Sequence, residues 1–126
     1  MPRLIYNLRE VEAGHLYEHV AIIGDGPQSK NKYVFNPQAV YPVFGINQVP
    51  YTNPTCDYQV VSYTHMLSFI KQYSLPCRPI CYISREDSDK YRLPHFYINW
   101  TIICTALWLC SLPQVRKIYI QGWDLT

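Results

Sequence analysis

The sequence has no block of like charges and no long apolar run, and its first residues do not show the pattern of a secretory leader. Lys and Arg number 11 against 9 Asp and Glu, and no stretch concentrates the positive residues, so we expect neither nucleic acid nor an anionic membrane as a partner. The longest apolar run, Ile102–Cys110, contains a threonine and is far shorter than the ~20 residues that span a bilayer. The first 15 residues carry scattered charges and no continuous apolar core. No signal peptide is predicted, and the expected compartment is the cytoplasm.

The cysteines and histidines give no pattern typical of a disulfide framework or a metal centre. There are five cysteines, an odd number at irregular spacing, as expected for reduced thiols. Cys77 and Cys81 form a C-x3-C pair with no second close pair. His15 and His19 are spaced to share a helical face, but their H-L-Y-E-H order is not the H-E-x-x-H order of a zinc site. We expect no metal, no cofactor and no disulfide.

The apolar pattern predicts one domain over residues 1–126. With 48% hydrophobic and 16% charged residues, the composition is typical of a globular protein large enough for one core. The expected strands are His19–Ile23, Pro42–Ile46, Tyr58–Ser62, Ile80–Ile83 and Lys117–Gln121, and the expected helices are Tyr63–Tyr73 and Ile98–Leu112. Because short apolar strands that alternate with helices are typical of covered parallel sheets, we predict a small α/β Rossmann-like domain, a mostly parallel sheet with helices on both faces.

A glycine-rich corner follows the first expected strand. In open parallel sheets, ligands bind beyond the carboxyl ends of the strands. Gly24 and Gly26 have no Cβ, so they allow positive φ and a close approach of a ligand to the backbone amides, which attract phosphate oxygens in such turns. A plain tight turn explains the same glycines, because G-x-G-P is not the full dinucleotide fingerprint. Asp25 opposes a phosphate here unless its carboxylate points away, caps a turn, shares a cation or contacts a sugar hydroxyl.

Five stretches stand in a recognisable order. They read A-I-I-G-D-G-P-Q-S, V-F-G-I-N-Q-V, C-D-Y-Q-V-V-S, I-N-W-T-I-I-C-T-A-L-W-L and V-R-K-I-Y-I-Q-G-W-D-L, and they are distributed along Val20–Leu125. This order resembles the core of the bacterial sialyltransferases and of related glycosyltransferase-like proteins of uncharacterised function. In that group a strand leads to a G-x-G-P-S loop, the next strand ends in asparagine, a later helix opens with small polar residues and the following strand ends in G-x-D. The resemblance implies a site for the nucleotide half of an activated sugar.

The ligand residues that this resemblance implies come from four segments. They are Gly24, Asp25, Gly26, Pro27, Gln28, Ser29, Asn47, Asn99, Thr101 and Asp124. The first six form the phosphate-side loop, in which Gln28 stands where the group usually has serine. Asn47 would bind a base, ribose or phosphate, or else support the turn after its strand. Asn99 and Thr101 lie at the implied polar helix start. Asp124 would orient loops or a ligand hydroxyl, or cap the end of the last strand.

The reaction half of the sialyltransferases has no counterpart in this sequence. In that group the histidine that acts as general base, and much of the acceptor site, follow the G-x-D strand, whereas this chain ends two residues after Asp124. His65 and His95 are the candidate substitutes, and packing or solvent roles explain them as well. Neither paired carboxylates nor a nucleophile–base spacing is visible.

Three functions therefore stay open at the level of the sequence. The first is non-catalytic binding, or sequestration, of a phosphate-bearing nucleotide or nucleotide-derived small molecule. The second is a minimal glycosyltransferase with a nucleotide-sugar donor, completed by a partner subunit or by an unrecognised base. The third is a structural or interaction module without a ligand. The 12 tyrosines and 3 tryptophans serve either to stack a nucleobase or to fill the core and an interface, and we expect a homo-oligomer.

The first testable prediction is that no metal or disulfide holds the fold. A chelator or a reductant should leave the melting temperature unchanged in a thermal melt. A clear drop would contradict this prediction, because the loss of a structural zinc or a native disulfide removes several kcal/mol of stability.

Overall fold

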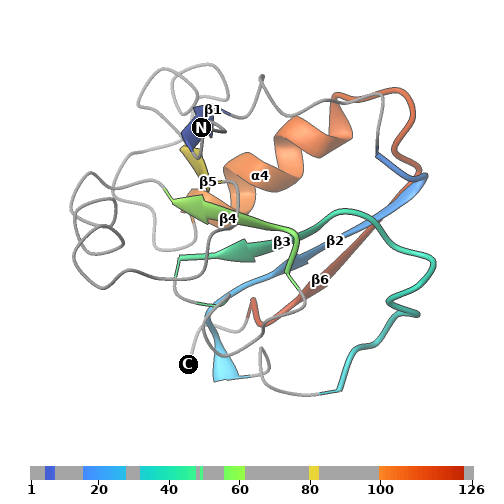
Figure 1. The fold of residues 1–126 in the computed structure, drawn as a ribbon, viewed down its shortest axis with the longest axis horizontal. Coiled ribbons are helices and arrows are strands. Elements are labelled where there is room, and N and C mark those ends of the chain that lie inside the picture. Colours follow the sequence, from blue (N-terminus) through green and yellow to red (C-terminus); the bar gives the residue numbers. More distant parts are fainter. Residues whose placement is uncertain are drawn as a thin grey trace.

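The described part of the chain forms a parallel β-sheet with a helix against one face (Figure 1). The computed structural model describes residues 5–7, 16–27, 32–47, 49, 56–61, 80–82 and 100–123. Its elements are β1 (Ile5–Asn7), β2 (His19–Ile23), β3 (Val43–Ile46), β4 (Tyr58–Val61), β5 (Ile80–Tyr82), α4 (Trp100–Cys110) and β6 (Lys117–Gln121).

The strand order places β2 between its two hydrogen-bonded neighbours β3 and β6. The sheet reads β1-β5-β4-β3-β2-β6, and every neighbouring pair is parallel. Ala21 of β2 lies opposite Val43 on one side and Tyr119 on the other. The chain leaves β2 toward β3 and later returns to place β6 on the opposite side of β2, which makes a topological switch point. The fold is a small α/β Rossmann-like domain, as the sequence predicts.

Side chains of β2 are buried on both faces of the sheet. Val20 and Ile22 lie in an apolar cluster with α4, whereas Ala21 and Ile23 lie in a second cluster on the other face. All four side chains have an exposed fraction of 0%. In the described part of the chain, the second face is covered by residues from the β2–β3 connection and from the ends of β3 and β4, namely Phe35, Val40, Val49 and Cys56. This two-sided burial explains why β2 is a short, continuous apolar run.

The helix α4 packs its apolar side chains on the first face of the sheet (Figure 1). The Trp108 ring meets Phe44 of β3 edge-on, with ring centroids 5.9 Å apart. The buried hydroxyl of Thr105 donates to the Thr101 carbonyl at 2.8 Å, so a polar side chain enters the core with its hydrogen bond made. The helix ends just before Ser111, whose amide donates to the Trp108 carbonyl at 3.0 Å. No helix in the described residues is long and apolar enough to cross a bilayer.

Element boundaries differ from the sequence prediction at a few places. The strand β3 begins one residue after Pro42 rather than at it, because proline has no N–H to donate. The first donor is the Val43 amide, which donates to the Asp57 carboxylate at 2.7 Å. The strand Ile5–Asn7, which pairs with β5, was not predicted. The expected helix over Tyr63–Tyr73 lies outside the described residues.

Gly24 closes the end of β2 against both β6 and α4. Its amide donates to the Gln121 carbonyl at 2.7 Å, one step beyond the last paired residues of the ladder. A Cβ at this position would lie 2.6 Å from the Gly122 oxygen and 2.7 Å from Ile102 Cδ1. No real Cβ tolerates such distances, so glycine is required here by packing.

The second testable prediction concerns this contact. Gly24→Ala should lower the free energy of unfolding by about 1–3 kcal/mol, because overpacking strains a filled site. Ile102→Val alone should lower the free energy of unfolding by about 0.5–1.5 kcal/mol. Because the shorter side chain removes one of the two clashes, the double variant should be less destabilised than the sum of the single variants. Denaturant titrations of the four proteins measure this coupling. Strict additivity would contradict the proposed clash with Ile102.

Candidate functional site

The carboxyl edge of the sheet brings several of the predicted ligand residues together. The segment Gly24–Pro27 follows β2, Asn47 follows β3, and Gly122 follows β6. The first turn of α4 reaches the same corner, because Ile102 stands against Gly24. These elements meet because parallel strands present all their carboxyl ends at one edge.

The glycine corner is a junction between β2 and β6. The Gly24 amide donates to the Gln121 carbonyl at 2.7 Å, and the Gly26 amide donates to the Gly122 carbonyl at 2.9 Å. Two of the amides expected to face a phosphate are therefore used by the neighbouring strand. The positive φ that Gly24 and Gly26 would allow is found instead at Gly122, where φ is 77°. Glycine is needed at position 24 because the strands and the helix pack closely there. Close helix–strand packing is one of the roles of glycine in such corners.

Asp25 presents an exposed acidic side chain at this edge. Its Oδ2 accepts a hydrogen bond from Asn47 Nδ2 at 3.4 Å, a long bond that links the loop after β2 to the turn after β3. The carboxylate of Asp25 thus lies beside Asn47 rather than capping its own turn. Since a carboxylate offers several acceptor positions, Asp25 retains capacity for donors that approach from solvent.

Asn47 supports the turn after β3 and also faces Asp25. Its φ of 53° is left-handed, a conformation that asparagine adopts more readily than most residues. Its backbone amide donates to the Val60 carbonyl at 2.8 Å, and its backbone carbonyl accepts from Gln59 Nε2 at 2.5 Å. Within the described part of the chain, its side-chain oxygen Oδ1 is buried and has no hydrogen-bond partner. Buried acceptors of this kind are rare, and each needs an explanation.

Gln59 is a site residue that the sequence prediction missed. It belongs to β4, its exposed fraction is 1%, and it holds the Asn47 carbonyl from the neighbouring strand. A signal was present in the sequence, since a glutamine stands inside the apolar run Y-Q-V-V. A polar side chain inside a buried strand needs a partner, and here the partner is the backbone of the turn.

Thr101 lies in the first turn of α4 and is buried, with an exposed fraction of 6%. Its carbonyl accepts the Thr105 hydroxyl, so its visible role is within the helix. No acidic residue stands in the first turn of α4, and therefore no carboxylate there neutralises the partial positive charge of the helix start.

Several predicted residues lie outside the described part of the chain. They are Gln28, Ser29, Asn99 and Asp124, together with the candidate bases His65 and His95. Of the four histidines, the structure describes His19, which begins β2 at the opposite edge of the sheet. Among the described residues, no three His, Cys, Asp or Glu side chains gather where they would hold a metal ion.

Comparison with known proteins adds no relative to this description. No protein-family model matches the chain, and neither the curated proteins nor the solved structures give a significant match. The resemblance to the bacterial sialyltransferases therefore stays a prediction made from the sequence motifs.

The third testable prediction separates the backbone and side-chain roles of Asn47. Asn47→Ala should lower the free energy of unfolding by about 1–2 kcal/mol, because alanine is strained at this φ. Asn47→Gly also removes the side-chain amide, but glycine adopts this φ without strain. It should therefore lower the free energy of unfolding by only about a few tenths of a kcal/mol. Chemical denaturation measures both. Equal destabilisation by the two variants would show that the side chain, rather than the left-handed turn, carries the stabilising role.

Proposed function

We propose that this protein binds a phosphate-bearing nucleotide or nucleotide-derived small molecule at the carboxyl edge of its sheet, without transforming it. The proposal rests on one observation, the meeting of Asp25 and Asn47 across the ends of two adjacent strands. It is supported by the parallel fold, since open α/β sheets bind ligands at this edge.

The chemistry of this pair favours a ligand that supplies hydrogen-bond donors. Asp25 presents an exposed carboxylate, which the Asn47 side chain holds at the end of the adjacent strand through its Nδ2 donor. The two oxygens of this carboxylate match two neighbouring hydroxyl groups. The ribose diol of a nucleotide has this arrangement, and an acidic residue that accepts a ribose hydroxyl is a recurrent feature of dinucleotide sites. In this proposal Asp25 binds sugar rather than phosphate.

In this proposal the phosphate of the ligand binds away from the negatively charged Asp25 carboxylate. The amides of Gly24 and Gly26 are occupied by β6, so they contribute little. The start of α4, which reaches this corner through Ile102 and has no acidic residue in its first turn, favours negative charge. We assign the phosphate-bearing part of the ligand to the α4 side of the edge.

A binding protein fits the described residues better than a transferase does. His19 lies at the amino end of β2, far along the strand from Asp25, so the one histidine that is described does not reach the proposed ligand. No observation in the described residues favours the glycosyltransferase alternative.

Compartment and self-association are part of the same proposal. The five cysteines, an odd number at irregular spacing, support a reducing compartment such as the cytoplasm. Exposed Tyr17 and Val34 are candidates for a homo-oligomer contact.

The fourth testable prediction is a thermal-shift screen with matched ribonucleotides and deoxyribonucleotides. A ligand at 100 times its dissociation constant stabilises the native state by about 2.7 kcal/mol, which raises the melting temperature of a domain of this size by several degrees. Ribonucleotides should give the larger shift, because a hydroxyl bound to a carboxylate contributes about 1.5–3 kcal/mol.

Two variants test the assignment to Asp25 and Asn47. Asp25→Asn should weaken the preference for ribose, and Asn47→Gly should weaken nucleotide binding while the fold is retained. Arg116→Gln, which removes an exposed charge at the amino edge of the sheet just before β6, is the control and should leave the shift unchanged. If no nucleotide raises the melting temperature, or if the shift survives both variants, the site is wrongly assigned and an interaction module without ligand becomes the better explanation.

A further inference from the structure

Trp123 is an exposed aromatic residue whose backbone lies beside the proposed ligand site. It follows Gly122, just after the end of β6, and its side chain has an exposed fraction of 44%. The carbonyl of the peptide bond that joins Gly122 to Trp123 accepts a hydrogen bond from the Gly26 amide at 2.9 Å. The backbone of Trp123 is therefore held against the loop that carries Asp25, although the two residues lie far apart in the sequence.

Trp123 differs from the other described aromatic side chains in its surroundings. Single exposed apolar residues are common on protein surfaces, so exposure alone carries no argument. The other Phe, Tyr and Trp side chains that the structure describes each pack against a second aromatic ring.

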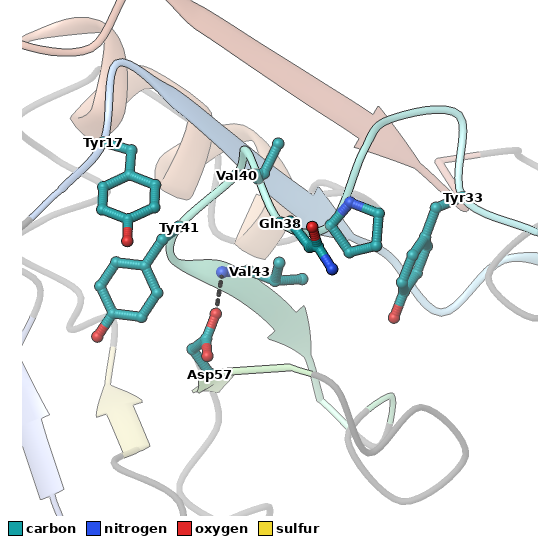
Figure 2. Close-up of a pocket in the computed structure, with 8 residues that line it drawn as sticks. Tyr17, Tyr33, Gln38, Val40, Tyr41, Val43 and Asp57 are labelled. Atoms are coloured by element: carbon teal, nitrogen blue, oxygen red, sulfur yellow. Dashed lines mark hydrogen bonds between the residues drawn. The ribbon is translucent and has the colours of Figure 1, made fainter.

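Exposed Tyr17 shows the contrast most clearly. Its exposed fraction is 53%, yet its ring packs on Tyr41 at a centroid distance of 5.4 Å at the amino edge of the sheet (Figure 2). For Trp123, no such ring partner occurs among the described residues. Within the described part of the chain, the indole of Trp123 is thus an aromatic surface that the fold does not use to pack on another ring.

The strand order places Trp123 and Asn47 on opposite sides of Asp25. The strand β2 lies between β3 and β6, and Asp25, Asn47 and Trp123 follow the ends of β2, β3 and β6. On the β3 side, the Asn47 side chain already contacts Asp25. On the β6 side, Trp123 is the exposed residue next to the loop.

The shape of a nucleotide fits this arrangement. A ribose carries its base at one end of the sugar ring and its phosphate at the other, so the two groups leave a bound diol in different directions. With the diol on Asp25 and the phosphate at the start of α4, the side toward β6 is the place for the base.

We propose that the indole ring of Trp123 stacks on the base of the bound nucleotide. This inference rests on the proposed function and adds the base to a site in which Asp25 binds the sugar. Stacking of a base on an aromatic side chain raises affinity roughly fivefold or more. Because every base has a flat aromatic face, stacking tolerates different bases, so an adenine nucleotide is a suitable probe.

The test compares adenosine 5′-monophosphate with ribose 5-phosphate, which has the same sugar and phosphate but no base. Calorimetric titration of the full chain should show roughly fivefold or more tighter binding of the nucleotide. Equal affinities would overturn the inference. If ribonucleotides raise the melting temperature but the adenine adds nothing to the affinity, the proposed function stands and only the stacking is wrong. If no nucleotide binds, both fail.

Two variants of Trp123 assign the gain to its ring. Because the side chain is exposed, its replacement leaves the core intact. Trp123→Leu should lose roughly fivefold or more in affinity for adenosine 5′-monophosphate and leave the affinity for ribose 5-phosphate unchanged. Trp123→Phe keeps an aromatic ring and should retain most of the affinity. Wild-type affinity in Trp123→Leu, or equal loss in both variants, would show that the ring does not stack on the base.

A matched control removes an exposed ring from the other edge of the sheet. Tyr17 precedes β2, and Tyr17→Leu should leave the affinity for adenosine 5′-monophosphate unchanged. An equal loss in Tyr17→Leu and Trp123→Leu would contradict a specific role of Trp123.

Tryptophan fluorescence supplies a readout that a purely structural role of Trp123 would not change. A stacked adenine should quench part of the indole emission as the site saturates, whereas ribose 5-phosphate should not. The quenching should be absent from Trp123→Phe, which still binds the nucleotide. Quenching of the same size in the wild type and in Trp123→Phe would assign the signal to Trp100 or Trp108 and contradict the proposal.

Discussion

The pairing of β2 with β6 is the constraint on which the rest of the structure depends. Five consecutive residue pairs join the two strands, and the contact continues beyond β2 through the amides of Gly24 and Gly26. It persists there because Gly24 has no Cβ to separate the two chains. This junction places β6 beside β2 at one side of the sheet and brings the start of α4 to the same corner.

The same junction determines which groups are available for a ligand. Once β6 occupies the amides of Gly24 and Gly26, the loop between them offers mainly the side chain of Asp25. In the proposed site, the side chains of Asp25 and Asn47 therefore recognise the ligand in place of backbone amides. The chemistry of these side chains suits hydroxyl groups. The left-handed turn at Asn47, braced by Gln59, sets the position of that pair.

At each edge of the sheet, a carboxylate accepts a hydrogen bond from a neighbouring strand end, but the two carboxylates have different surroundings. At the carboxyl edge, Asp25 accepts from the Asn47 side chain, and at the amino edge, Asp57 accepts from the Val43 backbone. The first carboxylate is exposed beside polar groups, whereas the second stands among tyrosine rings. The two carboxylates therefore link neighbouring strands at opposite edges of the sheet.

The sequence by itself determined the parallel α/β fold, because buried strands and helices differ in length and apolar period. It thereby predicted His19–Ile23 and Lys117–Gln121 as strands, with bounds that the structure confirms. It did not predict the short edge strand Ile5–Asn7, whose three residues are too few to show a period. Only the tertiary structure decided that Gly24 serves packing and that Asp57 joins tyrosines from two other segments. The physical reason is that such contacts depend on how strands and loops distant in sequence meet, which no local pattern records.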